Sequence, residues 1–224
     1  KEEEEGKADK AMIAAISSPA ILGSRTIRCA QRASRHASLR MAVRMDAGVE
    51  HTGAEAEGFA RFNFAPGSSR DSVVHGAERP GMRAEWDAPG AIPQSALAEW
   101  GEFMKSQGIT RGLSVMNDDE MLWFSSPGLL GGGALPTYDH VVLTGEGAAD
   151  KALGVLRAAE EAGEKVVLHC SGGQGRTGLL LGAWLVERHG LTPEAAAEEV
   201  AAWAKQSNVN RKGDAGKIRK FLGM

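Results

Sequence analysis

The chain has 224 residues, of which 42% are hydrophobic and 25% are charged. This composition is typical of one globular domain with polar additions, and it excludes a collagen-like or mostly disordered chain. The only cysteines are Cys29 and Cys170, which excludes a disulfide scaffold. No apolar run of about eighteen residues is present, so we expect no membrane-spanning helix.

The formal net charge of −3 is distributed unevenly. Residues 1–10 sum to −2, residues 12–45 hold six Arg and no acid and sum to +6, and residues 46–224 therefore carry −7. The segment 1–11 is predicted to be a disordered acidic extension. An acidic main part argues against nucleic acid or an anionic membrane as the partner.

The stretch 12–45 is rich in Arg, Ala and Ser and lacks acids, which is typical of an organelle transit peptide. It predicts import into a plastid (chloroplast), with a mitochondrion as the second choice. A basic disordered arm on a cytoplasmic protein is the alternative interpretation. Residues 46–58 are predicted to be a polar linker, and 59–224 the folded domain.

The apolar pattern of the domain predicts its elements in chain order. They are a strand at 73–74, a turn at 75–81, a helix at 93–107, a strand at 109–115, loops at 116–137, a strand at 138–144, a helix at 148–162, a strand at 165–169, a helix at 176–188, and a last helix that begins at Pro193 and is capped by Thr192. This alternation predicts an α/β fold with a mainly parallel central sheet flanked by helices.

Several residues outside the main motif have predicted structural roles. Trp100, Trp184 and Trp203 fall on apolar helix faces and are expected in the core. Arg79 is expected to stabilise its turn, with a place in the substrate cleft as the alternative, and His75 to be a satisfied histidine at a strand end.

One passage, VVLHCSGGQGRTG at 166–178, carries chemistry. A buried strand leads into a glycine-rich loop and then a helix, so loop amides and the helix dipole favour an anion there. Arg176 supplies a bidentate fork for phosphate oxygens, and the same positive field favours the thiolate of Cys170 as a nucleophile. Thr177 is placed to donate its hydroxyl to that sulfur, and His169 to brace the loop. The predicted substrate-binding residues are Ser171, Gly172, Gly173, Gln174, Gly175 and Arg176.

Other interpretations of this loop explain less. A tight strand-to-helix turn or a buried lone cysteine does not account for Cys, Arg and three glycines placed around one anion. No Gly-Lys-Ser/Thr closes the motif, which excludes a Walker loop. Cys29 lies in the predicted transit peptide, so the domain keeps one cysteine. One cysteine and scattered histidines predict no metal site and no cofactor.

The loop HCSGGQGRTG resembles the His-Cys-x5-Arg-Thr/Ser signature of the cysteine-based protein tyrosine phosphatase superfamily. FNFAPGSSRDSVVHGAERPG (62–81), WGEFMKSQGITR (100–111) and GAWLVERHGLTPEAA (182–196) are similar to a compact, dual-specificity-like branch. The resemblance covers roughly residues 60–222 and implies the three-layer fold of that superfamily. It also implies a phosphocysteine at Cys170 and stabilisation of the equatorial phosphate oxygens by Arg176.

The resemblance also implies a general acid on the loop after the strand that precedes the signature. The family usually has Asp there, whereas this chain has Gly145 and Glu146. Glu146 is therefore the first candidate, with Asp139 and Asp150 as alternatives that are more easily explained structurally. Arg211 and Asp214 are further residues that a fold-back of the chain would bring to the loop.

Three functions compete at this stage. The first is a protein tyrosine or dual-specificity phosphatase acting on a phosphorylated protein or a small phosphomonoester. The second is a weak or inactive phosphate-binding pseudophosphatase, because the acid departs from the family pattern. The third is a lipid or small-molecule phosphatase, which the uncharged residues between Cys170 and Arg176 disfavour.

Overall fold

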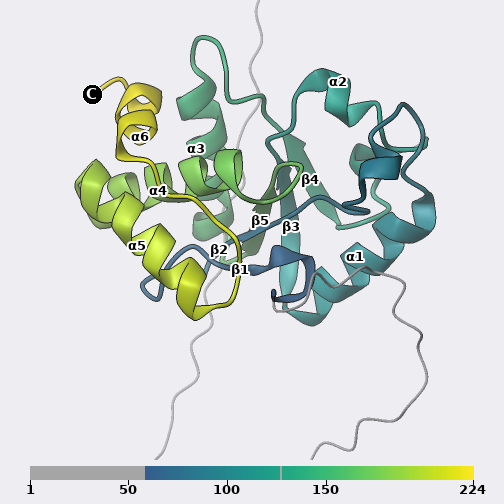
Figure 1. The fold of residues 1–224 in the computed structure, drawn as a ribbon, viewed down its shortest axis with the longest axis horizontal. Coiled ribbons are helices and arrows are strands. Elements are labelled where there is room, and N and C mark those ends of the chain that lie inside the picture. The colour runs from purple at the N-terminus through teal and green to yellow at the C-terminus, as the bar shows by residue number, and fades with distance from the viewer. Residues whose placement is uncertain (1–58, 127) are drawn as a thin grey trace, which may run out of the picture. The chain divides into compact units, whose positions relative to one another are not determined.

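The computed structural model describes residues 59–126 and 128–224 (Figure 1). The predicted extension 1–11, transit peptide 12–45 and linker 46–58 lie outside these residues. The described part forms one five-stranded sheet whose strands are β1 (Ala65–Pro66), β2 (Val74–Ala77), β3 (Ile109–Ser114), β4 (Thr137–His140) and β5 (Lys165–His169). Their order is β1-β2-β5-β3-β4, and only β1 pairs antiparallel with its neighbour. The predicted α/β fold with a mainly parallel sheet is confirmed.

Six α-helices and three short 3-10 helices surround the sheet in this part of the chain. The α-helices are α1 (Gln94–Ser106), α2 (Asp118–Met121), α3 (Ala148–Glu161), α4 (Gly175–His189), α5 (Pro193–Gln206) and α6 (Ala215–Leu222). The 3-10 helices are Arg61–Asn63, Ala84–Trp86 and Leu129–Gly131. Across 59–126 and 128–224, none of the helices has the length and apolar character needed to cross a bilayer.

Two hydrophobic cores lie on the two faces of the sheet, and the central strand β5 feeds both. Val166 and Leu168 pack in the core built with α3, α4, α5 and α6. Val167 points the other way, into the core built with α1. Figure 1 shows α1 on one side of the sheet and α4 to α6 on the other. The structure is therefore three-layered, as the resemblance implied.

The long apolar segments were predicted well, because their patterns are local. Strand β5 has the predicted bounds, and α1, α3 and α4 match within a residue or so at each end. The hydroxyl of Thr192 accepts a hydrogen bond from Ala195 N at 3.2 Å and caps α5 as predicted. Trp100 and Trp184 are buried, whereas Trp203 is only partly buried, so its placement in the core was wrong.

The apolar pattern of the sequence did not predict the bounds of the elements that are set by pairing between strands. Residues predicted as turn at 75–77 belong to β2, because each of them pairs in register with β5. The predicted strand 138–144 ends at His140, where its partner β3 also ends. The predicted loops at 116–137 contain the short helix α2. Helix α6 was not predicted, because eight residues are too few to show a clear apolar pattern. In the structure Asp214 caps this helix, and its Oδ1 accepts a hydrogen bond from Lys217 N at 3.0 Å.

Candidate active site

The signature loop lies at the carboxyl edge of the sheet, between β5 and α4. His169, the last residue of β5, pairs with Ala77 of β2 on one side and with Ser114 of β3 on the other. The loop that follows is thus flanked by the ends of three parallel strands, the edge where open α/β sheets bind ligands. It also precedes the first turn of α4, where backbone amides lack helical partners.

Cys170 is 4% exposed, and the side chain of Thr177 contacts it from the first turn of α4. The Thr177 hydroxyl donates to Cys170 Sγ at 3.3 Å, while its oxygen accepts from Cys170 N at 3.1 Å. A hydroxyl donor aimed at the sulfur stabilises a thiolate more than a thiol. The arrangement therefore suits a nucleophilic sulfur.

Arg176 is held by a carboxylate that sequence reasoning missed, Glu120 of α2. Arg176 Nη2 donates to Glu120 Oε1 at 2.7 Å, and Nη1 donates to Oε2. These hydrogen bonds raise the pKa of Arg176 and lower the pKa of Glu120, so the pair is ionised at neutral pH. Glu120 therefore orients the guanidinium and is unsuited to be a general acid. The Asn-x-x-Glu spacing from Asn117, whose N–H donates to Glu120 Oε2 at 2.7 Å, was the signal available in the sequence.

A second arginine, Arg211, supports the loop from the interior. It is 7% exposed and donates through Nε to Gly173 O at 3.3 Å, and through Nη1 and Nη2 to Ala65 O and Asn63 O. Burial lowers the pKa of Arg211 to about 10, so the guanidinium is still protonated at neutral pH. No ion pair joins it to a carboxylate among residues 59–126 and 128–224. Arg211 thus adds positive potential beneath the loop.

Asn63 and His169 hold the two ends of the loop. Asn63 Nδ2 donates to Gly172 O at 3.1 Å and to Asn210 O at 2.9 Å, which ties the loop to the segment that carries Arg211. His169 contacts Cys170 O through Nδ1 at 3.1 Å and the Tyr138 hydroxyl through Nε2. Burial lowers the pKa of His169 to about 4, so the ring is neutral. A carbonyl only accepts, so Nδ1 carries the proton.

The other predicted loop residues have defined places. Ser171 O accepts from Arg79 N at 2.9 Å. Gly173 has φ +69°, and a Cβ there would lie 2.6 Å from Ala77 O, so this position requires glycine. Gly172, Gln174 and Gly175 line the cavity described below.

Arg79 has the structural role predicted for it, whereas His75 lies inside β2 and not at the strand end predicted for it. The Arg79 guanidinium is buried and donates to Pro80 O at 3.2 Å, to Arg83 O at 3.1 Å and to Gly81 O and Asp87, which fixes the turn. His75 contacts Val73 O through Nδ1 at 3.2 Å.

The three candidate acids lie in different settings. Asp139 is in β4, and its Oδ2 forms an ion pair with Arg111 Nη1 at 3.2 Å. This ion pair gives the carboxylate a structural role. Asp150 is in the first turn of α3 without a capping hydrogen bond. Glu146 is exposed between Gly145 and Gly147, on the loop that joins β4 to α3. No hydrogen bond or ion pair in the described residues joins any of the three to Cys170 or Arg176.

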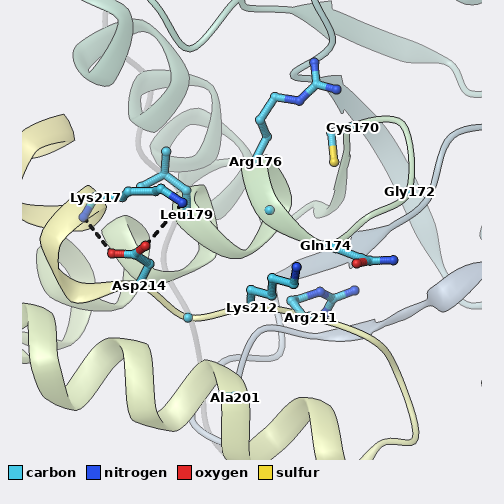
Figure 2. A pocket seen from close by; sticks show the side chains of 12 residues that line it. Cys170, Gly172, Gln174, Arg176, Leu179, Ala201, Arg211, Lys212, Asp214 and Lys217 are labelled. Carbon is cyan, nitrogen blue, oxygen red and sulfur yellow. Dashed lines mark hydrogen bonds and ion pairs between the residues drawn. The ribbon is translucent and has the colours of Figure 1, made fainter.

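A cavity of about 920 Å³ opens beside the loop (Figure 2). Cys170 and Arg176 line one end, and Arg211, Lys212, Asp214 and Lys217 line the remainder. Arg211 and Asp214, the two residues that the sequence offered as a fold-back, therefore lie at this site. No group of three or more His, Cys, Asp or Glu within the described ranges is arranged to hold a metal ion.

No model of a known protein family matches the chain, and no curated protein matches it. Several solved structures are similar. Kinase associated phosphatase is 18% identical with a TM-score of 0.49, over 66% of this chain and 83% of its own. Tk-PTP in its active form is 22% identical with a TM-score of 0.45, over 68% and 92%. TpbA of P. aeruginosa is 15% identical with a TM-score of 0.42, over 76% and 99%.

The strand, signature loop and helix occur in the order that the sequence predicted, at the carboxyl edge of a mainly parallel sheet.

Proposed function

We propose that the chain hydrolyses phosphomonoesters through a phosphocysteine, as a protein tyrosine or dual-specificity phosphatase. The observation that carries the proposal is the geometry of one loop. The buried sulfur of Cys170 accepts a hydrogen bond from Thr177. Arg176 is oriented by Glu120, and both groups lie next to the first turn of α4. In this proposal the nucleophile and the anion-binding groups are preorganised for a phosphate group.

The reaction has two steps in this proposal. The thiolate of Cys170 attacks phosphorus, the S–P bond forms, and the bond from phosphorus to the leaving oxygen breaks while that oxygen receives a proton. Water then attacks phosphorus and gives a proton to the group that acted as the acid, and the S–P bond breaks to release phosphate and the thiolate. Arg176 neutralises charge on the equatorial oxygens in both steps.

Hydrolysis of para-nitrophenyl phosphate by the full chain tests this function. We expect turnover that is insensitive to chelator, absent in Cys170→Ser and severely reduced in Arg176→Lys, because an ammonium keeps the charge but loses the fork. Thr192→Ser, a conservative change at the cap of α5, is the matched control. Vanadate binding without turnover between about pH 5 and pH 8 would favour the pseudophosphatase.

We propose Glu146 as the general acid. Its support is the position of the loop, between β4 and α3, and the glycines on both sides that leave the carboxylate exposed. Glu146→Gln should slow a poor leaving group such as phosphoserine more than an activated aryl phosphate, because only a basic leaving oxygen needs the proton. Asp139→Asn and Asp150→Asn are the controls. Equal effects on both substrates would remove Glu146 from the mechanism.

We further propose that residues 12–45 direct import into a plastid. The support is their composition alone, which combines six Arg with no acid. A fusion of residues 12–58 to a fluorescent protein should accumulate in plastids. A second fusion with all six Arg replaced by Gln is the control, and a diffuse cytosolic signal from the first fusion contradicts the proposal.

A further inference from the structure

A methionine from the turn after β2, Met82, lies at the rim of the signature loop. Ser171 Oγ donates a hydrogen bond to Met82 Sδ at 3.8 Å. A Cβ built at Gly172 would lie 3.7 Å from Met82 Cε, and Gly172 lines the same cavity as Cys170. Met82 is nevertheless 42% exposed. Its side chain therefore contacts the loop on one side and keeps free surface on the other.

The turn that carries Met82 is held by a buried guanidinium. Arg79 donates to Pro80 O at 3.2 Å and to Gly81 O, both directly before this methionine in the chain. It also donates to Arg83 O at 3.1 Å, directly after the methionine. Because one planar set of donors binds three carbonyls of the same turn, the backbone on both sides of Met82 is fixed.

The same turn is fixed against the signature loop and against an aromatic ring. Arg79 N donates to Ser171 O at 2.9 Å. Gly81 has φ +59°, and a Cβ there would lie only 2.7 Å from the ring of Trp86. The fold thus presents Met82 to the loop on a rigid backbone. A substrate group that contacts Met82 does not have to order this segment first.

The geometry of phosphoryl transfer determines which part of a substrate reaches Met82. In an in-line displacement, the leaving oxygen departs on the side of phosphorus opposite the attacking sulfur. Cys170 is 4% exposed, so the leaving group projects outward from the sulfur past the rim of the loop. A phosphotyrosine has its aromatic ring at this level, whereas a phosphoserine has only its Cβ methylene. A thioether makes favourable contacts with the edge of an aromatic ring.

The apolar surface that this turn offers next to the loop is short. Arg83 and Glu85 follow Met82 and form an ion pair at 3.7 Å. The guanidinium of Arg83 also lies over the ring of Trp86, 5.0 Å from its centroid. The acyl chains of a lipid phosphate would need a longer apolar surface than one methionine provides, so a single ring fits this rim better.

We propose that Met82 is a specificity-determining residue whose thioether contacts the aromatic ring of a phosphotyrosine and thereby favours aryl over alkyl phosphates. This inference rests on the proposed function and specifies the substrate class of its site. The selection is made by a side chain of the turn after β2, because the residues between Cys170 and Arg176 are glycines, a serine and a glutamine that bind the phosphate itself.

Two peptides that differ only in phosphotyrosine or phosphoserine test the proposal. Binding to Cys170→Ser, measured by fluorescence anisotropy, avoids the chemical step and its dependence on the leaving group. We expect the phosphotyrosine peptide to bind more tightly, and Met82→Gln in this background to reduce the ratio of affinities about three- to tenfold, the size of one sulfur–aromatic contact. Met82→Leu keeps an apolar contact and should retain more of the ratio. Met224→Gln, a change at another exposed methionine, should leave the ratio unchanged.

The outcomes separate this proposal from the catalytic one. If the ratio depends on Met82 but the protein with Cys170 intact hydrolyses neither peptide, the ring contact stands and the proposed reaction fails. An unchanged ratio in Met82→Gln overturns the contact, and an equal loss for both peptides shows that Met82 only supports the loop. An alkyl or lipid phosphomonoester whose binding depends on Met82 when that of the phosphotyrosine peptide does not would overturn the assignment to aryl phosphates.

Discussion

Replacing Gly178 with alanine tests how the signature loop is supported. A Cβ at Gly178 would lie 2.1 Å from the carbonyl oxygen of Lys212 and 3.0 Å from its carbonyl carbon. The segment cannot retreat, because on its other side a Cβ at Gly213 would lie 2.0 Å from Ala197 O of α5. The chain between Arg211 and Gly213 is therefore held between two helices, and an added methyl group must displace it.

The expected change in the free energy of unfolding is the balance of one stabilising and two destabilising contributions. Alanine is favoured over glycine inside a helix by about 1 kcal/mol. Overpacking against backbone costs about 1–3 kcal/mol. Moving the segment also weakens the hydrogen bonds from Arg211 to Gly173 O and from Lys212 N to Gln174 O, at about 1 kcal/mol each. The net expectation for Gly178→Ala is a loss of about 2–4 kcal/mol in the free energy of unfolding, which lowers Tm by about 5–15 °C.

Thermal unfolding followed by circular dichroism, together with kcat on an aryl phosphate at a temperature where both proteins are folded, measures the effect. We expect kcat to fall as well, because the loop carbonyls lose their supports. Gly154→Ala on α3 is the control, since its Cβ would meet only Arg157 Nη2 at 3.6 Å, and it should raise Tm slightly. A Gly178→Ala protein with wild-type Tm and kcat would refute the argument from close approach.

Three further predictions concern charges and donors at the site. Glu120→Gln should lower kcat at least about tenfold on an aryl phosphate, because Arg176 loses the carboxylate that orients it, and Glu120→Asp should retain more activity. Burial raises the pKa of Glu78 from 4.5 to about 7, so the folded state binds the proton more tightly and stability falls as pH rises from about 5 to about 7. Glu78→Gln should therefore gain Tm relative to wild type on going from pH 5.5 to pH 8, and a pH-independent difference would contradict this. Thr177→Val should slow alkylation of Cys170 by iodoacetamide several-fold at about pH 6, and Thr177→Ser should restore the rate.

The reacting groups were predictable because they are local in the chain. Cys170 and Arg176 are separated by five residues, and the buried strand before them has an apolar pattern that needs no partner to be recognised. The fold class followed from the same kind of information, since strands alternating with helices admit few topologies. Strand β2 was mispredicted because His75 and Gly76 have little strand character, and only their pairing with β5 makes them a strand.

Two of the groups that hold the loop, Asn63 and Glu120, were not predicted, because they come from distant parts of the chain. Asn63 and Gly172 are 109 residues apart, and Arg176 and Glu120 are 56 residues apart. Neither Asn63 nor Glu120 belongs to a pattern that points to phosphate chemistry. Each is needed for a different reason, since Asn63 joins the loop to the segment of Arg211 and Glu120 balances the charge of Arg176.

The separation between reacting residues that are local in the chain and supporting residues that are distant has a physical cause. The carbonyls of Gly172 and Gly173 accept hydrogen bonds from Asn63 and Arg211, so the loop amides are left to bind an anion. The residues that hold the loop must therefore contact its carbonyl side, and they come from other elements of the fold. Arg211 serves both needs, because it satisfies carbonyls by hydrogen bonding and remains charged without a carboxylate partner in the described part of the chain. A lysine at this position would keep the charge but lose the planar set of donors that reaches Gly173 O, Ala65 O and Asn63 O together. The requirement for arginine at position 211 is thus set by three carbonyls that the fold assembles, two of them 146 and 148 residues away in sequence.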